Sequence, residues 1–175
     1  MANTFTPRLN SNGMVNSIYY YSGNPFYTSG YGLPNCTCYA WGRWYEITGK
    51  KPTGLSLGNA ENWYSHADNY ARGKTPKLGA IICFADGPYS GAGHVAVVEQ
   101  IASDGTVTFS NSAYGGAYFY LRSGKSINNY GYESGYKFQG FIYLDDQPGP
   151  GPGPGPGPSP YKPKKMPLMY YLKKI

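Results

Sequence analysis

Two cysteines, Cys36 and Cys38, lie two positions apart in the stretch NCTCYAW, with no acidic or histidine neighbour. Such a pair can serve as a metal clip, as half of a redox pair, as packing groups or as the source of a nucleophile. Residues two apart on a helix point to nearly opposite sides, so these two thiols cannot easily bridge. Cys83 lies in the apolar stretch AIICFA, where packing is its simplest role. With an odd count of three cysteines, we expect no disulfide framework and at least one free thiol.

Cys36 is the best-placed nucleophile of the three. Asn35 is a good N-cap, which makes Cys36 the first residue of a helix. Unpaired backbone N–H groups and the helix dipole stabilise a thiolate there, and the same N–H groups can hold the oxyanion of a tetrahedral intermediate. Cys38, further along the helix, receives less of either effect. The competing interpretation for Cys36 is a packing role, because free cysteine is among the most buried residue types.

A thiolate nucleophile needs a base, and the chain has two histidines. His66 lies in the predicted helix NWYSHADN among polar residues, which favours a solvated or packing role. His94 opens the predicted strand HVAVVEQI, directly after the glycine-rich stretch GPYSGAG. A titratable residue at the mouth of an apolar strand, beside a loop, is typical of a catalytic group on a rigid scaffold. We therefore favour His94 over His66 as the base.

The imidazole also needs a partner that orients its second ring nitrogen. A turn at residues 103–105 pairs the predicted strand 106–112 with the predicted strand 94–101 in antiparallel fashion, which brings Asn111 near His94. An amide oxygen can accept the imidazole N–H, as in Cys-His-Asn enzymes. Ser110 points to the opposite face of the strand, and alternation alone does not settle which of these two side chains faces His94.

Metal and phosphate sites fit the sequence poorly. Cys-x-Cys with a distant Cys83 and two histidines lacks the ligand spacing of a zinc site. There is no Asp-x-Asp run for calcium, and glycine-rich stretches such as GPYSGAG lack the lysine and helix context of a phosphate loop. We expect neither a metal ion nor another cofactor.

The elements that must position these residues follow from the hydrophobic periodicity. Residues 1–30 read as loops with short helical or strand pieces. The spacing predicts a helix over 36–48, ended by Gly49, and a second helix near 59–68. The pattern then changes to a period of two. Strands are expected at 80–85, 94–101, 106–112, 117–122 and 138–144. Helices followed by antiparallel strands predict an α+β fold, with N-terminal helices packed on a predominantly antiparallel sheet.

Composition divides the chain into three parts. Residues 1–146 form the expected globular domain, and residues 147–160, QPGPGPGPGPGPSP, read as an extended Pro/Gly linker. Residues 161–175 form a basic tail with five lysines and no acid, which leaves ten basic and nine acidic residues in 1–160. We interpret the tail as a solvated end or the truncated start of a wall-binding module. A cationic contact to an anionic wall polymer or a membrane surface is the alternative.

Several classes of protein are disfavoured. The nearly neutral domain argues against a nucleic-acid partner. No apolar run approaches the roughly 18 residues of a membrane span. The N-terminal stretch MANTFTPRLN lacks the basic start and apolar run of a signal peptide. We therefore expect synthesis in a cytoplasm, with any outside role depending on another route of delivery.

Taken together, these stretches resemble the CHAP family of cysteine- and histidine-dependent amidohydrolases and peptidases. The similarity covers roughly residues 30–145, in matching order and spacing. The stretches that carry it are NCTCYAW, GNAENW (58–63), PKLGAIICF (76–84), AGHVAVVE (92–99), TVTFSNSAYGG (106–116) and GFIYL (140–144). The resemblance implies a papain-like, NlpC/P60-like fold.

By position, the resemblance implies Cys36 as nucleophile, His94 as base and Asn111 where the family usually has Glu, Asp or Asn. Two features depart from the family pattern. Ala80 stands where an aspartate is common, which we expect to affect local structure more than chemistry. The acidic cluster that binds calcium upstream of the cysteine in some phage members is missing, so no calcium dependence through that site is expected.

The resemblance implies a hydrolase of bacterial peptidoglycan. The bond is either the N-acetylmuramoyl–L-alanine amide or a peptide bond in the stem or cross-bridge. A domain, a spacer and a basic tail suit a phage lysin, which waits in the host cytoplasm until its release to the cell wall, or a hydrolase carried in a virion. The alternatives are a wall-binding or structural module without turnover, and a cysteine peptidase that acts on protein.

Overall fold

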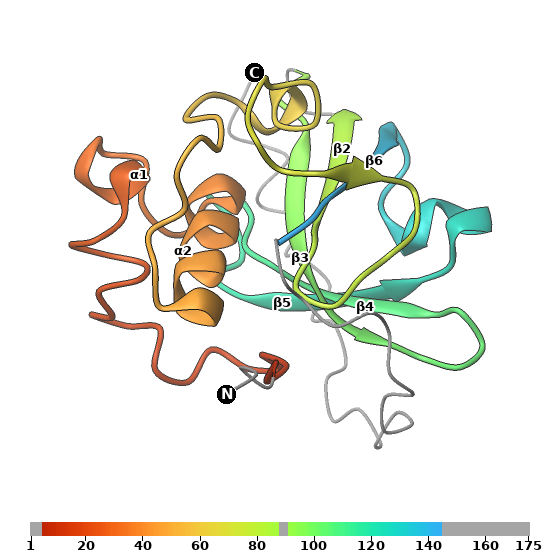
Figure 1. The fold of residues 1–175 in the computed structure, drawn as a ribbon, viewed down its shortest axis with the longest axis horizontal. Coiled ribbons are helices and arrows are strands. Elements are labelled where there is room, and N and C mark those ends of the chain that lie inside the picture. Colours follow the sequence, from red (N-terminus) through yellow and green to blue (C-terminus); the bar gives the residue numbers. More distant parts are fainter. Residues whose placement is uncertain (1–4, 88–90, 145–175) are drawn as a thin grey trace, which may run out of the picture.

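The computed structural model describes residues 5–87 and 91–144, in which helix α2 packs against a six-stranded sheet and the short helix α1 packs against α2 (Figure 1). The strand order is β1-β6-β2-β3-β4-β5, and every neighbouring pair is antiparallel. This confirms the predicted α+β class. The elements are α1 (Pro25–Thr28), α2 (Cys36–Thr48), η1 (Ala60–Asn62), β1 (Arg72–Gly73), β2 (Ile81–Asp86), β3 (His94–Ile101), β4 (Val107–Asn111), β5 (Tyr120–Gly124), η2 (Ser126–Gly131) and β6 (Tyr136–Ile142).

Helix α2 has the predicted bounds because both of its ends carry strong local signals. The Asn35 side chain accepts a hydrogen bond from the backbone N–H of Thr37, as an N-cap does. Gly49 ends the helix in the left-handed conformation, with φ of 67°, and its N–H bonds the carbonyl of Tyr45. Between these caps, Tyr39 and Trp44 are fully buried against the sheet.

The sheet is buried on both faces at β3. Val95 and Val97 pack toward α2, whereas Ala96 and Val98 pack into a second core that also contains Phe109. Strand β3 is therefore apolar along most of its length, because neither face meets water. η2 and the segment that follows it contribute aromatic residues to this second core.

The predicted helix near 59–68 is wrong. Only the single turn η1 forms there, and several backbone groups of this stretch bond to residues outside it. The Arg72 guanidinium donates to the carbonyls of Trp63 and His66, at 3.3 and 2.8 Å, and pairs with Asp68. The N–H of Glu61 donates to the carbonyl of Ala92, just before β3. These bonds occupy backbone groups that a helix over 59–68 would use, and local periodicity does not report them.

The strand predictions fare better. Strand β3 has the predicted bounds, and a turn at residues 103–105 joins it to β4, with the N–H of Ala102 bonded to the carbonyl of Thr106. The strand expected at 117–122 begins later, at Tyr120, because the N–H of Ala113 bonds the carbonyl of Ala117 across a turn. The two-residue strand β1 was not expected.

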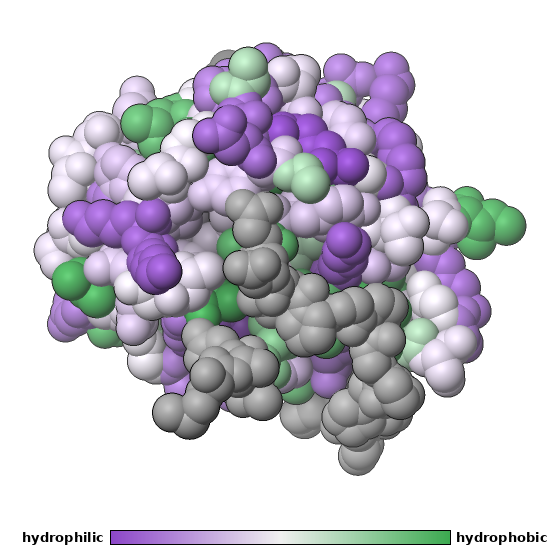
Figure 2. Space-filling view, viewed as in Figure 1, coloured by the Kyte–Doolittle hydropathy of each residue, from purple (hydrophilic) through white to green (hydrophobic). Residues whose placement is uncertain are grey.

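The predicted linker 147–160 and basic tail 161–175 lie outside the described residues. Within the described ranges, none of the helices combines the length and apolar character that crossing a bilayer requires. The face drawn in Figure 2 is mostly hydrophilic or of intermediate hydropathy, and its apolar side chains stand in small separate groups.

Candidate active site

Cys36 lies where the start of α2 meets β3. Backbone N–H groups of Val95, Thr37 and Cys36 itself are close enough to lower the pKa of its thiol, and the residue is 8% exposed. Val95 is the neighbour of His94 in β3, and Tyr132, whose ring stacks on His94, is close enough to feel the charge of a Cys36 thiolate. The structure therefore places the two residues that the sequence singled out in one region, on neighbouring segments.

Asn111 lies against His94, with 2.9 Å between the imidazole Nε2 and the amide Oδ1. The amide is oriented by a second bond, in which its Nδ2 donates to the carbonyl of Phe109 at 3.0 Å. Because the amide presents its oxygen, the imidazole must carry its hydrogen on Nε2. The other nitrogen, Nδ1, then has a lone pair that can accept a proton.

Ser110 faces the other way, as strand alternation predicts. Its hydroxyl donates to the carboxylate of Glu99 at 2.7 Å and accepts from the Tyr39 hydroxyl at 2.8 Å. Of the two side chains that the sequence left open, Asn111 therefore faces His94 and Ser110 faces the opposite side of β4.

Burial controls the protonation of the pair. It raises the pKa of the Cys36 thiol above its ordinary 9.0, although the surrounding N–H groups act to lower it. Burial also lowers the pKa of His94 to about 4, against the opposing effect of its hydrogen bond to Asn111. The backbone N–H groups at the start of α2 lower the pKa of Cys36, as predicted, but desolvation of the thiol raises it by more. The resting pair is therefore a neutral thiol beside a neutral imidazole, rather than a preformed ion pair.

The remaining cysteines and the second histidine lie in other surroundings. All three cysteines are free and buried. The Cys38 thiol contacts the carbonyl of Tyr20 at 3.6 Å, and burial raises its pKa to about 12. Cys83 is fully buried in the core next to α2, as its apolar stretch predicts. His66 is exposed after η1, in keeping with a solvated role.

The segment before Cys36 is tied to the segment after Asn111. The Asn35 N–H donates to the Ser112 hydroxyl at 3.1 Å, and the Gly115 N–H donates to the carbonyl of Pro34 at 3.4 Å. These bonds hold the start of α2 against the end of β4. Sequence reasoning missed Ser112, which has no signal beyond its place next to Asn111.

Gly93, directly before His94, allows a close crossing of chains. Its φ is +70°, and a Cβ there would lie 2.5 Å from the Glu61 nitrogen and 2.6 Å from the Phe84 oxygen. The expected result of Gly93→Ala is a loss of about 2–4 kcal/mol in the free energy of unfolding, since both backbone strain and overlap must be relieved. Urea denaturation measures it.

A matched control separates strain from overlap. Gly105 has a similar φ of +83°, and a Cβ added there would meet nothing within 4 Å. Gly105→Ala should cost about 1 kcal/mol, as left-handed strain alone requires. Equal losses for the two variants would show that the close crossing at Gly93 is unimportant.

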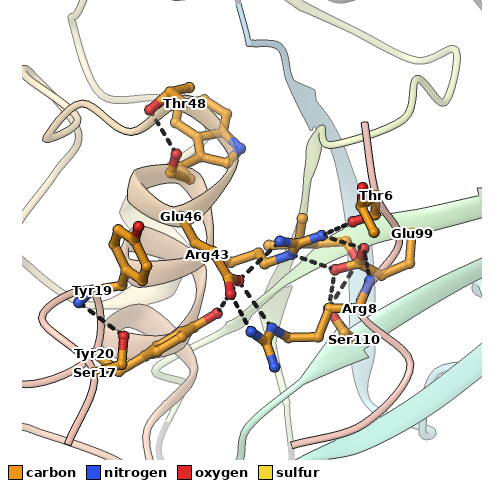
Figure 3. Close-up of polar contacts among 12 residues, drawn as sticks. Thr6, Arg8, Ser17, Tyr19, Tyr20, Arg43, Glu46, Thr48, Glu99 and Ser110 are labelled. Carbon is orange, nitrogen blue, oxygen red and sulfur yellow. Dashed lines mark hydrogen bonds and ion pairs between the residues drawn. The ribbon is translucent and has the colours of Figure 1, made fainter. Parts of the chain in front are cut away.

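A buried polar network fixes the elements that carry the site (Figure 3). Arg43 of α2 pairs with Glu99 of β3 through two contacts of 2.9 Å, and Glu99 is fully buried. Ser110 of β4 donates to the same carboxylate. The backbone N–H of Arg8 adds a bond of 2.7 Å. The register of β3 against β4 shifts at Glu99, which makes it the extra residue of a bulge.

The described ranges, 5–87 and 91–144, contain no group of three or more His, Cys, Asp or Glu side chains arranged to hold a metal ion. The predicted independence from calcium remains a prediction.

Comparison with known proteins places these features in a family. The CHAP domain family matches residues 26–113, about half of the chain, and this range includes Cys36, His94 and Asn111. A solved structure of N-acetylmuramoyl-L-alanine amidase from Staphylococcus aureus matches with a TM-score of 0.49 and 28% identity, covering 64% of this chain and 32% of the other. The crystal structure of Ly7917 matches with a TM-score of 0.45 and 19% identity, covering 63% and 53%.

Two relatives from Staphylococcus aureus are similar in sequence. The probable autolysin LDP is 40% identical over 103 residues, which cover 58% of this chain and 34% of that protein. The staphylococcal secretory antigen SsaA is 41% identical over 114 residues, covering 64% and 40%. The matched part spans about a third to two-fifths of the length of these curated relatives. Since the family match covers half of the chain, the protein belongs to the CHAP domain family.

Proposed function

We propose that this chain hydrolyses an amide bond of bacterial peptidoglycan, with Cys36 as nucleophile, His94 as base and Asn111 as the residue that orients the imidazole. The observation that carries the proposal is the hydrogen bond between His94 Nε2 and Asn111, on a strand whose next residue, Val95, places its N–H close to the Cys36 sulfur. The name of one relative, a probable autolysin, supports a wall substrate.

The chemistry follows from the two nitrogens of His94. Nδ1 takes the thiol proton as the Cys36 sulfur attacks the carbonyl carbon, and the carbonyl oxygen becomes an oxyanion. The backbone N–H of Cys36, at the start of α2, stabilises that oxyanion. The imidazolium then gives its proton to the leaving amine, and a thioester forms. Water, deprotonated by His94, attacks the thioester and releases the acid with the free thiol.

A neutral resting pair is compatible with this sequence of steps. Proton transfer and attack can be concerted, so that the thiolate exists only as the bond to carbon forms. Asn111 accepts from Nε2 throughout and stabilises the imidazolium when it appears. The base therefore works at neutral pH, because a His94 whose pKa is about 4 is unprotonated there.

Purified cell walls and mass spectrometry of the released fragments test the proposal and identify the bond. Cleavage of the N-acetylmuramoyl–L-alanine amide gives intact glycan strands and peptides with a new alanine amino group. Cleavage within the stem or cross-bridge leaves peptide attached to the glycan. Walls that yield no new amino groups, with the protein still bound, would instead indicate a binding module. Cleavage of casein without cleavage of walls would indicate a peptidase that acts on protein.

Replacing Asn111 with alanine is expected to lower kcat/KM on walls about 100-fold, because an imidazole without its partner is free to turn and small misplacements of a catalytic group are costly. Ser110→Ala is the matched control, since it removes a neighbouring buried group that bonds Glu99 and not His94. The expected loss for Ser110→Ala is in stability, measured by denaturation, with little change per folded molecule. Equal losses of activity in the two variants would contradict the orienting role of Asn111.

Delivery to the wall remains a prediction. Release from a host cytoplasm, carriage in a virion, and a contact between the basic tail and anionic wall polymer are expectations from the sequence. The basic tail lies outside the described residues, and the routes of delivery come from the family resemblance alone.

A further inference from the structure

Tyr132 lies flat on the candidate base. The ring centroids of Tyr132 and His94 are 4.7 Å apart, with an angle of 25° between the ring planes. Tyr132 also stacks on Phe84, at 4.5 Å and 18°. Phe84 and His94 are paired residues of β2 and β3, so they stand side by side on the sheet. One tyrosine ring thus covers both of them.

The Tyr132 ring is fixed from several sides. Its hydroxyl is hydrogen-bonded to the Tyr120 hydroxyl of β5 at 3.0 Å. The Arg122 guanidinium lies over both rings, 5.7 Å from Tyr120 and 5.8 Å from Tyr132. Tyr136, at the start of β6, meets the Tyr132 ring edge to face at 4.8 Å. Aromatic and cation–π contacts of this kind favour one orientation of a ring over others.

The position of Tyr132 has a consequence for the polar pair beneath it. His94 is 4% exposed and Asn111 is fully buried, although both are polar. Water at the imidazole would compete for the Nε2 hydrogen and for the amide oxygen, and would weaken the bond that orients the ring. Burial also lowers the pKa of His94, in agreement with a dry environment.

We propose that Tyr132 is a positioning residue, whose ring shields the hydrogen bond between His94 and Asn111 from water and holds the imidazole in the orientation that serves Cys36. The inference rests on the proposed function, in which His94 is the base. The ring carries this role and the hydroxyl does not, because the hydroxyl is already paired with Tyr120.

Other groups around His94 can influence its titration and must stay constant in a test. Arg122 is close enough for its charge to lower the pKa of His94, and it is paired with Glu133 on the surface. η1, which packs against β3, places Glu61 near Gly93. The rings of Tyr132 and Tyr136 contact the imidazole directly. The other titratable groups of this region reach His94 through these residues, through Arg122 or through Gly93; they are Cys36 of α2, Glu61 of η1, Tyr120 of β5 and Glu133 of the segment after η2. In the variants compared by titration, Tyr132 is the one member of this set that is altered.

Tyr132→Leu, Tyr132→Phe and Tyr130→Leu are compared by NMR titration of the histidine rings. The chain has only two histidines, and exposed His66 serves as an internal reference. In the wild type and in Tyr132→Phe, His94 should titrate near pH 4. In Tyr132→Leu its pKa should rise by at least about one unit toward 6.5, because water reaches the ring. Tyr130→Leu is the matched control, since Tyr130 packs on Phe138 and Phe141.

The pH profile of activity gives a second test, in which the direction of the shift is fixed. A base must be unprotonated, so the acid limb of the kcat/KM profile should move to higher pH in Tyr132→Leu, by the same amount as the His94 titration. Tyr132→Phe and Tyr130→Leu should keep the wild-type limb. An unchanged His94 titration in Tyr132→Leu would overturn the shielding role. The two proposals can fail separately. If the His94 titration shifts in Tyr132→Leu but wall hydrolysis survives Cys36→Ala, the shielding role is supported and the proposed function is refuted.

A measurement on the unaltered protein covers the case in which Tyr132→Leu does not fold. A shielded Nε2 hydrogen exchanges slowly and gives a resolved downfield resonance at pH 7, which should vanish in Asn111→Ala. If no such resonance is observed in the wild type, water reaches the bond and the proposal is wrong.

Discussion

Cys36→Ala is expected to abolish the hydrolysis of purified walls, with a loss of at least about 1,000-fold in kcat/KM. Removing the sulfur removes the atom that forms the thioester in the proposed mechanism, whereas the N–H groups around it and His94 stay in place. The fold should tolerate the change, because alanine favours the first turn of α2 and only one buried atom is lost. Turbidity of a wall suspension measures lysis, and sedimentation with walls measures binding, which should survive.

Cys38→Ala is the matched control for this experiment. Cys38 is also buried and also in the first turn of α2, but its thiol contacts the carbonyl of Tyr20. We expect Cys38→Ala to keep wall lysis per folded molecule. If Cys36→Ala clears walls as fast as the wild type and Cys38→Ala does not, the nucleophile has been assigned to the wrong cysteine.

The parts of the molecule that sequence reasoning placed correctly are those with local causes. Helix α2 begins and ends as predicted because Asn35 and Gly49 act within one turn of the chain. Strand β3 has its predicted bounds because it is apolar on both faces and follows a glycine. The neighbourhood of Asn111 and His94 depended on a short turn at residues 103–105, which fixes the partner strand.

The parts that it missed depend on contacts that hydrophobic periodicity does not report. Arg72 bonds the carbonyls six and nine residues earlier, within the stretch predicted as a helix. Tyr132 lies 38 positions after His94 in a chain with 20 tyrosines, so no spacing singles it out. The protonation of Cys36 was also missed, because desolvation depends on how the whole core closes around the sulfur.

Glu99 was the one long-range feature with a visible signal. A carboxylate within the apolar run HVAVVEQI must either face water or find a buried partner. The structure gives it Arg43, from the helix that carries Cys36, and Ser110, the neighbour of Asn111. The network therefore joins the helix that carries Cys36 to the strand that carries Asn111.

Arg43→Met should consequently be among the most destabilising substitutions in the chain, costing about 3–5 kcal/mol in the free energy of unfolding. It leaves the Glu99 carboxylate fully buried without its counter-charge, while Glu46 keeps its pairing with Arg8. Urea denaturation gives the value. Lys137→Met removes one partner of an exposed ion pair with Asp86 and should leave stability almost unchanged.

Adding Glu99→Gln to Arg43→Met tests the cause of the loss. Glutamine removes the unpaired charge but keeps an oxygen that accepts from the Arg8 N–H and the Ser110 hydroxyl. The double variant should recover more than half of the stability lost by Arg43→Met alone, which a double-mutant cycle measures as a coupling energy. Recovery would identify the buried charge as the source of the cost. A double variant as unstable as Arg43→Met would instead mean that the arginine acts through packing and through its bond to the Thr6 carbonyl.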